Sequence, residues 1–166
     1  MTGRRLVLAA TALVGVSLAG CGFELRRPPE LRFRTIQLAG FTPRSPVATE
    51  LKALIDATPD TRVVEALKDA QVVLRAITEG KEKSVVAQTA AAQIREFELR
   101  YRFSFQLRSA AGKELIPESE IVLKRSLTYS ESAALAKEQE EAFLYRAMQA
   151  DIVAQVLRRL ASVQVL

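Results

Sequence analysis

The side chains that usually carry out catalysis are scarce in this sequence. Histidine is absent, which removes the commonest general base at neutral pH and the commonest metal ligand. A serine nucleophile would need a lysine as its base, and no spacing in the sequence brings such a pair together. The carboxylates Glu138, Glu140 and Glu141 have the spacing of an exposed helix face. We therefore predict no enzymatic activity, no metal site and no cofactor.

The residue best placed for chemistry is the only cysteine, Cys21, which excludes an intramolecular disulfide. Arg4 and Arg5 precede a short apolar run, 6–16, as in a secretory signal peptide. That run is shorter than the roughly 18 to 20 residues that span a bilayer. Residues 18–21, Leu-Ala-Gly-Cys, resemble the bacterial lipoprotein box, in which the cysteine is acylated and becomes the first mature residue.

The acylated cysteine predicts how the chain is divided. Residues 1–20 are the expected signal peptide, 21–31 the acylated cysteine and a proline-stiffened tether, and 32–166 a single domain. Two or more acyl chains would anchor it stably, because each buried methylene contributes about 0.8 kcal/mol. Gly22 stands where lipoproteins kept at the inner membrane typically have aspartate. We therefore expect a lipid-anchored protein on the periplasmic side of the outer membrane.

The charge balance excludes few partners. The chain has 24 basic and 19 acidic residues, and removal of Arg4 and Arg5 lowers the net charge from +5 to +3. This excess is too small to indicate a nucleic-acid-binding face. It suits an anionic partner or a membrane surface, and equally an ordinary soluble surface.

The strongest structural pattern is the segment 95–108. Its apolar residues are Phe97, Leu99, Tyr101, Phe103, Phe105 and Leu107, and they alternate with polar residues throughout. This period of two indicates a β-strand with one apolar and one polar face. We predict that the aromatic row is core, covered by the rest of the domain, and does not cradle a lipid.

Several other segments are predicted strands. They are 32–39, a short piece at 61–64, a strand buried on both faces at 69–77, and a return strand at 114–129 that follows a hairpin connection at 109–113. The strand at 69–77 either turns at Glu79-Gly80 or continues to Val86. Residues 87–93 are either a loop or a helical turn. Arg125 interrupts the apolar face of the return strand, near the edge of that face.

Two segments are predicted helices. Ser45-Pro46 begins the first, which ends at 58–60. Its apolar face consists of Val47, Leu51, Leu54 and Ile55. The second is capped by Ser130-Glu131-Ser132 and runs to about Ala161. Its stripe consists of Leu144, Met148, Ile152, Val153, Val156, Leu157 and Leu160. We predict an α+β fold in which two helices pack on one face of a mostly antiparallel sheet of about four strands.

Four passages together resemble the lipopolysaccharide-assembly lipoproteins of the LptE family. They are the opening at 21–26, the strand at 95–108, the basic segment 124–126 and the Ala-Leu-Ala-Lys-Glu segment at 134–138. The resemblance implies a protein that plugs an LptD-type outer-membrane β-barrel, helps it to fold and binds lipopolysaccharide. It also implies basic ligand contacts near the start of the last helix and in the loop before the central strand.

Lys137 matches the first of these contacts. The loop at 87–93 holds no lysine or arginine, so the nearest candidates for the second contact are Lys83 and Arg95. A solvated Lys137 paired with Glu141 remains an alternative. A lipoprotein that serves as an adaptor or secretion-machinery component for another partner also remains open.

Overall fold

The alternating segment predicted at 95–108 is β4 (Ile94–Ser109), which lies between two long antiparallel neighbours, β3 (Val72–Gln88) and β5 (Glu114–Thr128). The computed structural model describes residues 30–163. The apolar side chains of β4 from Leu99 to Leu107 are fully buried. From Leu99 to Leu107 the row is therefore core, as predicted. Phe97, at the start of the row, is only partly buried and lies at the margin of this core.

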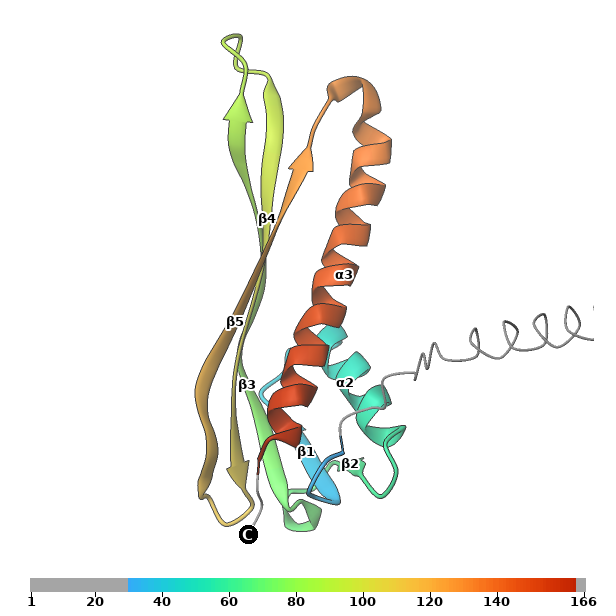
Figure 1. Ribbon diagram of the computed structural model, residues 1–166, viewed down its shortest axis with the longest axis vertical. Coiled ribbons are helices and arrows are strands. Elements are labelled where there is room, and N and C mark those ends of the chain that lie inside the picture. Colours follow the sequence, from blue (N-terminus) through green and yellow to red (C-terminus); the bar gives the residue numbers. More distant parts are fainter. Residues whose placement is uncertain (1–29, 164–166) are drawn as a thin grey trace, which may run out of the picture.

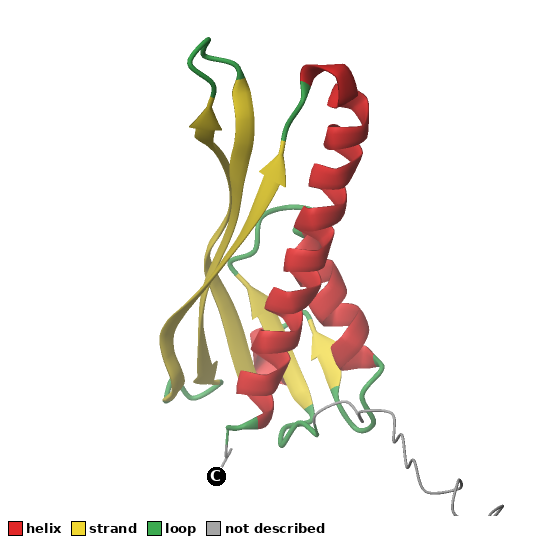
Figure 2. Cartoon of the chain, turned by 45° about the horizontal axis from the view of Figure 1, so that its top comes forward, coloured by secondary structure: helices red, strands yellow, loops and turns green. Residues whose placement is uncertain are grey.

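Two shorter strands extend the sheet beyond β3 (Figure 2). β1 (Thr35–Ala39) pairs in parallel with β3, and β2 (Arg62–Val64) pairs in parallel with β1. The described part of the chain thus has one mixed sheet in the order β2-β1-β3-β4-β5, where about four mostly antiparallel strands were predicted. The difference arises because a helix separates β1 from β2, and such a crossover returns the chain parallel to itself.

β3 is long because the chain does not turn at Glu79-Gly80. Of the two alternatives left open by the sequence, the continuous strand is correct. Residues 87–88, predicted in the loop, pair with β4, which leaves 89–93 as the connection. The prediction that 69–77 is buried on both faces is wrong. Ile77 is 43% exposed, because the helices cover one side of the sheet only.

Both helices lie on the apolar side of the sheet, the long one over β4 and β5 and the short one beside it, nearer β2 (Figure 1). The first, α2 (Pro46–Asp56), begins as predicted: the Ser45 hydroxyl accepts a hydrogen bond from the Ala48 N–H at 3.0 Å, and Pro46 occupies the first turn. The buried residues of α2 are Val47, Leu51 and Ile55. Leu54, predicted to share this face, is 43% exposed. This short helix therefore packs through a single row of apolar side chains.

The second helix, α3 (Ala134–Ala161), buries the predicted stripe: Met148, Ile152, Val153, Val156, Leu157 and Leu160 are buried, and Leu144 is half-buried. The predicted cap is wrong. Residues 131–133 form a 3-10 turn, and α3 begins at Ala134 without a side-chain cap. The 28 residues of α3 exceed the 11 of α2, so the first turns of α3 extend past α2 (Figure 1).

Candidate functional site

A cavity of about 160 Å³ lies between the first turns of α3 and the ends of the long strands. Its lining residues are Lys83, Ile94, Phe97, Leu127, Tyr129, Ala134, Lys137, Glu138 and Glu141. The lining combines apolar side chains with two lysines and two glutamates. Two of the three predicted basic candidates, Lys83 and Lys137, therefore meet here, although they come from distant parts of the sequence.

The apolar part of the cavity is held by the β4–β5 ladder. Phe97 and Leu127 are paired across the two strands, and Leu127 is buried. The ring of Tyr129 meets that of Phe97 edge to face, with the centroids 5.3 Å apart. Such a surface accepts hydrocarbon, because burial of apolar surface is favourable at roughly 25 cal/mol per Å².

Lys83 points to the helix side of the sheet from β3. Its Nζ lies 2.6 Å from Oε2 of Glu141 on α3 and 4.1 Å from the centroid of the Phe97 ring. A β-bulge between Ala76 and Thr78 decides this direction. Before the bulge the even-numbered residue Leu74 faces the helices, and after it the odd-numbered residues do.

Lys137 approaches the cavity from α3. Its Nζ donates to Oγ1 of Thr128 at 2.9 Å and to Oε2 of Glu140 at 2.8 Å, and its side chain is only 20% exposed. The predicted alternative, a solvated lysine paired with Glu141, is wrong in its partner, because Glu141 pairs with Lys83. Lys137 is held in place across the gap between α3 and β5.

Arg95, the third predicted basic candidate, does not line this cavity. Arg95 is exposed next to it, and its backbone carbonyl accepts a hydrogen bond from the Tyr129 N–H at 2.8 Å. Its side chain is not among those that line the cavity. Cys21, the predicted acylation site, lies outside the described residues.

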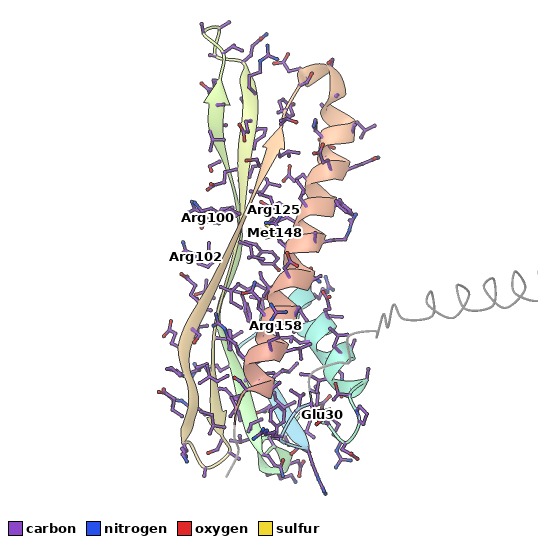
Figure 3. The ribbon with its side chains drawn as sticks, viewed as in Figure 1. Glu30, Arg100, Arg102, Arg125, Met148 and Arg158 are labelled. Carbon is purple, nitrogen blue, oxygen red and sulfur yellow. The ribbon has the colours of Figure 1, made fainter. Side chains whose placement is uncertain are left out.

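The face of the sheet opposite the helices is polar. Figure 3 shows Arg100 and Arg102 on this side, away from α3. Arg100 pairs with Glu98 at 2.8 Å, and Arg102 lies 3.4 Å from Glu120 on β5. The hydrogen bond from Arg100 is the main cause that lowers the pKa of Glu98. These arginines thus have carboxylate partners within the chain, on a face that the helices leave uncovered.

A larger depression, of about 590 Å³, lies at the opposite end of the molecule, beside the C-terminus of α2. Its lining residues include Arg34, Asp56, Asp60 and Arg62. Asp56 already accepts hydrogen bonds from Lys52 and from the Val63 N–H, and the bond from Lys52 is the main cause that lowers its pKa. We prefer the smaller cavity as the candidate site, because it combines cations with apolar surface.

Within residues 30–163, no helix has the length and apolar character required to cross a bilayer. The same residues contain no group of three or more histidine, cysteine, aspartate or glutamate side chains placed to hold a metal ion.

Arg125 and Asp151 show how α3 is fastened to the edge of the sheet. Arg125 faces the helix side of β5, as its interruption of the apolar pattern predicts, and its Nη2 lies 3.1 Å from Oδ2 of Asp151. Met148, one turn before Asp151 on α3, is fully buried. β5 is an edge strand, so an arginine here reaches solvent while still contacting the helix.

The fold defines the class of this protein as a two-layer α+β domain without a recognisable catalytic constellation in its described part. The sequence profile of the LptE family, described as lipopolysaccharide-assembly, matches residues 33–160. The chain therefore belongs to the LptE family. A search of curated protein sequences finds no match.

Solved structures show the same architecture. Lipoprotein B of Nitrosomonas europaea, described as uncharacterized, is 32% identical, with a TM-score of 0.72 over 85% of this chain and 91% of the other. Rare lipoprotein B of Shewanella oneidensis is 26% identical, with a TM-score of 0.64 over 77% and 94%. A minor lipoprotein of Acinetobacter baumannii, 20% identical, shares the fold with a TM-score of 0.63 over 80% and 94%.

Sequence reasoning missed the part that Glu141 and the apolar floor play in the cavity. Glu141 was assigned to an exposed helix face, whereas its side chain is only 23% exposed and bonded to Lys83. The signal that could have pointed to it is the alternative of a strand continued through Lys83, although the side on which this lysine lies depends on the bulge.

Proposed function

We propose that this protein is an outer-membrane lipoprotein that binds lipopolysaccharide in the cavity rimmed by Lys83 and Lys137 and occupies an LptD-type β-barrel. Membership of the LptE family, described as lipopolysaccharide-assembly, supports a role in the assembly of lipopolysaccharide. The observation that supports lipopolysaccharide as the ligand is that two lysines line the same cavity as the apolar side chains of Phe97 and Leu127. Lipopolysaccharide presents phosphates and acyl chains, and lysine binds phosphate through charge-assisted hydrogen bonds.

The polar face of the sheet supports the proposal that the partner is a β-barrel. Opposite the helices, Arg100 and Arg102 form a polar surface with the carboxylates of Glu98 and Glu120, which offset their charges. A wall that exposes polar side chains, like the lumen of a large barrel, meets such a surface without leaving a charge buried and unpaired. α2 and α3 cover most of the apolar side of the sheet, whereas the polar face is left uncovered and is available to a partner.

We also propose that the protein is attached to the membrane through acyl chains on Cys21. Residues 1–20 act as the signal peptide, acylated Cys21 and the tether to residue 31 hold the protein at the membrane, and 32–166 form the LptE-like domain. Replacement of Cys21 by serine should move the protein from the membrane fraction to the soluble periplasmic fraction. Intact mass measurement of the purified native protein should show acyl chains on Cys21. An unacylated native product would contradict the anchor.

Lys137→Ala tests the ligand. We expect binding of purified lipopolysaccharide to fall about tenfold, which corresponds to the loss of one charge-assisted hydrogen bond. Lys124→Ala is the matched control, because Lys124 lies on the open face and pairs with Glu98. Calorimetry or fluorescence titration measures both. Equal affinities of the wild type and Lys137→Ala would reject this cavity as the site.

Depletion of the protein tests its cellular role. We expect surface lipopolysaccharide to fall and the barrel partner to mature poorly, and affinity purification should bring down a large β-barrel protein in equal amount. Normal surface lipopolysaccharide together with normal barrel maturation would contradict the assignment. Purification with a different stoichiometric partner would favour the adaptor or secretion-machinery alternative.

A further inference from the structure

The Lys83–Glu141 ion pair closes one side of the cavity. It joins β3 to α3 over 2.6 Å, and the two side chains are 35% and 23% exposed. Lys83 also lies over Phe97, 4.1 Å from the ring centroid. The lysine therefore covers part of the apolar floor while its charge is satisfied by Glu141.

The cavity is small for a ligand site. A volume of about 160 Å³ is smaller than the roughly 300–1,000 Å³ of typical ligand pockets. Displacement of the Lys83 side chain would expose Phe97 and enlarge the cavity toward β3. Only the side chain of Lys83 has to move for this. The backbone beside it is held in place by a 2.7 Å hydrogen bond from the Tyr145 hydroxyl of α3 to the Glu82 carbonyl.

We propose that the Lys83–Glu141 pair is a latch that the phosphate of an incoming amphiphile opens. Lys83 exchanges the Glu141 carboxylate for the phosphate, leaves the face of Phe97 and admits an apolar chain to the floor. Glu141 is then a residue that sets affinity by competing with the ligand for Lys83. This inference rests on the proposed function, because it takes the cavity as the lipopolysaccharide site.

The exchange is energetically reasonable. Partly exposed ion pairs contribute little net free energy, because water screens the charges and two flexible side chains must be ordered. A phosphate offers stronger, charge-assisted hydrogen bonds than a single carboxylate and carries more charge at neutral pH. The Lys83–Glu141 pair is thus stable enough to keep Lys83 over Phe97 when no ligand is bound. It is also weak enough to be broken by a ligand that supplies both a phosphate and a hydrocarbon chain.

Glu141→Gln tests the latch against Glu138→Gln as the matched control. Both residues lie on α3 and line the cavity, and both changes remove one negative charge, but only Glu141 is the partner of Lys83. With purified lipopolysaccharide as the probe, we expect Glu141→Gln to bind about two- to fivefold more tightly than Glu138→Gln, as expected for a partly exposed ion pair. Circular dichroism and thermal unfolding verify that each variant is folded.

The same two substitutions in a Lys83→Ala background complete a double-mutant cycle. There the extra gain of Glu141→Gln over Glu138→Gln should disappear, because no lysine remains to be released. An equal gain of the two variants in the wild-type background, or an undiminished difference in the Lys83→Ala background, would overturn the latch alone. Failure of the wild-type protein to bind lipopolysaccharide would overturn both the latch and the proposed ligand.

Discussion

The hydroxyl of Ser45 donates a hydrogen bond to Oε2 of Glu79 over 2.6 Å. Oγ of Ser45 also accepts a hydrogen bond from the Ala48 N–H, so one buried hydroxyl caps α2 and fastens it to β3. Oε1 of Glu79 in turn accepts the hydroxyl of Tyr101, at 2.9 Å. This polar network lies under the helices and joins α2, β3 and β4. It lets a glutamate lie on the apolar side of the sheet, because both of its oxygens are paired.

Ser45→Ala should lower the free energy of unfolding by about 1–2 kcal/mol, because it removes a helix cap and leaves an oxygen of Glu79 without its donor. Ser126→Ala is the control, since Ser126 is exposed on β5. Urea denaturation monitored by circular dichroism measures both. Equal midpoints for the two variants would show that the Ser45–Glu79 bond contributes nothing net.

Phe103→Ala and Phe143→Ala compare the same substitution in two environments. Phe103 is fully buried and stacks between Phe41 and Phe105, whereas Phe143 is 61% exposed on α3. We expect Phe103→Ala to cost about 3–5 kcal/mol and Phe143→Ala to stay within about 0.5 kcal/mol of the wild type. Unfolding free energies from denaturant titration decide the comparison. A large loss for Phe143→Ala would mean that this ring has a packing partner in solution.

Gly40→Ala should destabilise the protein more than Gly112→Ala. Both glycines have positive φ, +74° and +89°, which costs alanine about 1–2 kcal/mol. At Gly40 an added Cβ would also lie 2.4 Å from the Ala76 carbonyl oxygen, whereas at Gly112 it would meet open space. Thermal unfolding of the two variants should separate them clearly, with Gly112→Ala showing the smaller decrease in Tm. The reverse order would contradict the close approach of Gly40 to β3.

Stability should decline at alkaline pH through Tyr101. Burial, together with the hydrogen bond to Glu79, raises the pKa of this hydroxyl. Above about pH 10 the unfolded chain loses the phenolic proton while the folded chain retains it, so the free energy of unfolding falls as pH rises. Tyr101→Phe should show a shallower decline between about pH 10 and 11.5, measured by urea denaturation at fixed pH. An unchanged slope in Tyr101→Phe would assign the alkaline loss to other groups.

Much of the fold could be predicted because side-chain direction along a regular element is a local property. The alternation from Phe97 to Leu107 specifies a strand with one buried face, and the spacing of Met148, Ile152 and Val156 specifies a helix with one buried stripe. Ser45-Pro46 likewise marks the start of α2, because capping involves only neighbouring residues. The strand, the helix stripe and the helix start can each be predicted from neighbouring residues alone.

The candidate site could be predicted only in part. Lys137 was identified through the family resemblance and Lys83 through its position before the loop, but neither inference shows that the two lysines line one cavity. Arg95, proposed with them, does not line it. The cavity exists because α3 runs past α2 and faces the ends of β3, β4 and β5, which is a relation between distant segments.

The sequence alone therefore determined the apolar strand, the two helices and the single cysteine in its signal-like context, since each depends on residues that are close along the chain. Only the tertiary structure decided the parallel pairing of β1 and β2, the direction in which Lys83 points and its partnership with Glu141. The parallel pairing follows from the helical crossover between β1 and β2. The direction of Lys83, and with it the pairing with Glu141, follows from the bulge between Ala76 and Thr78, which reverses the facing of the residues that follow on β3. Its position is set by how β3 pairs with β1 and β4, and no local pattern records that.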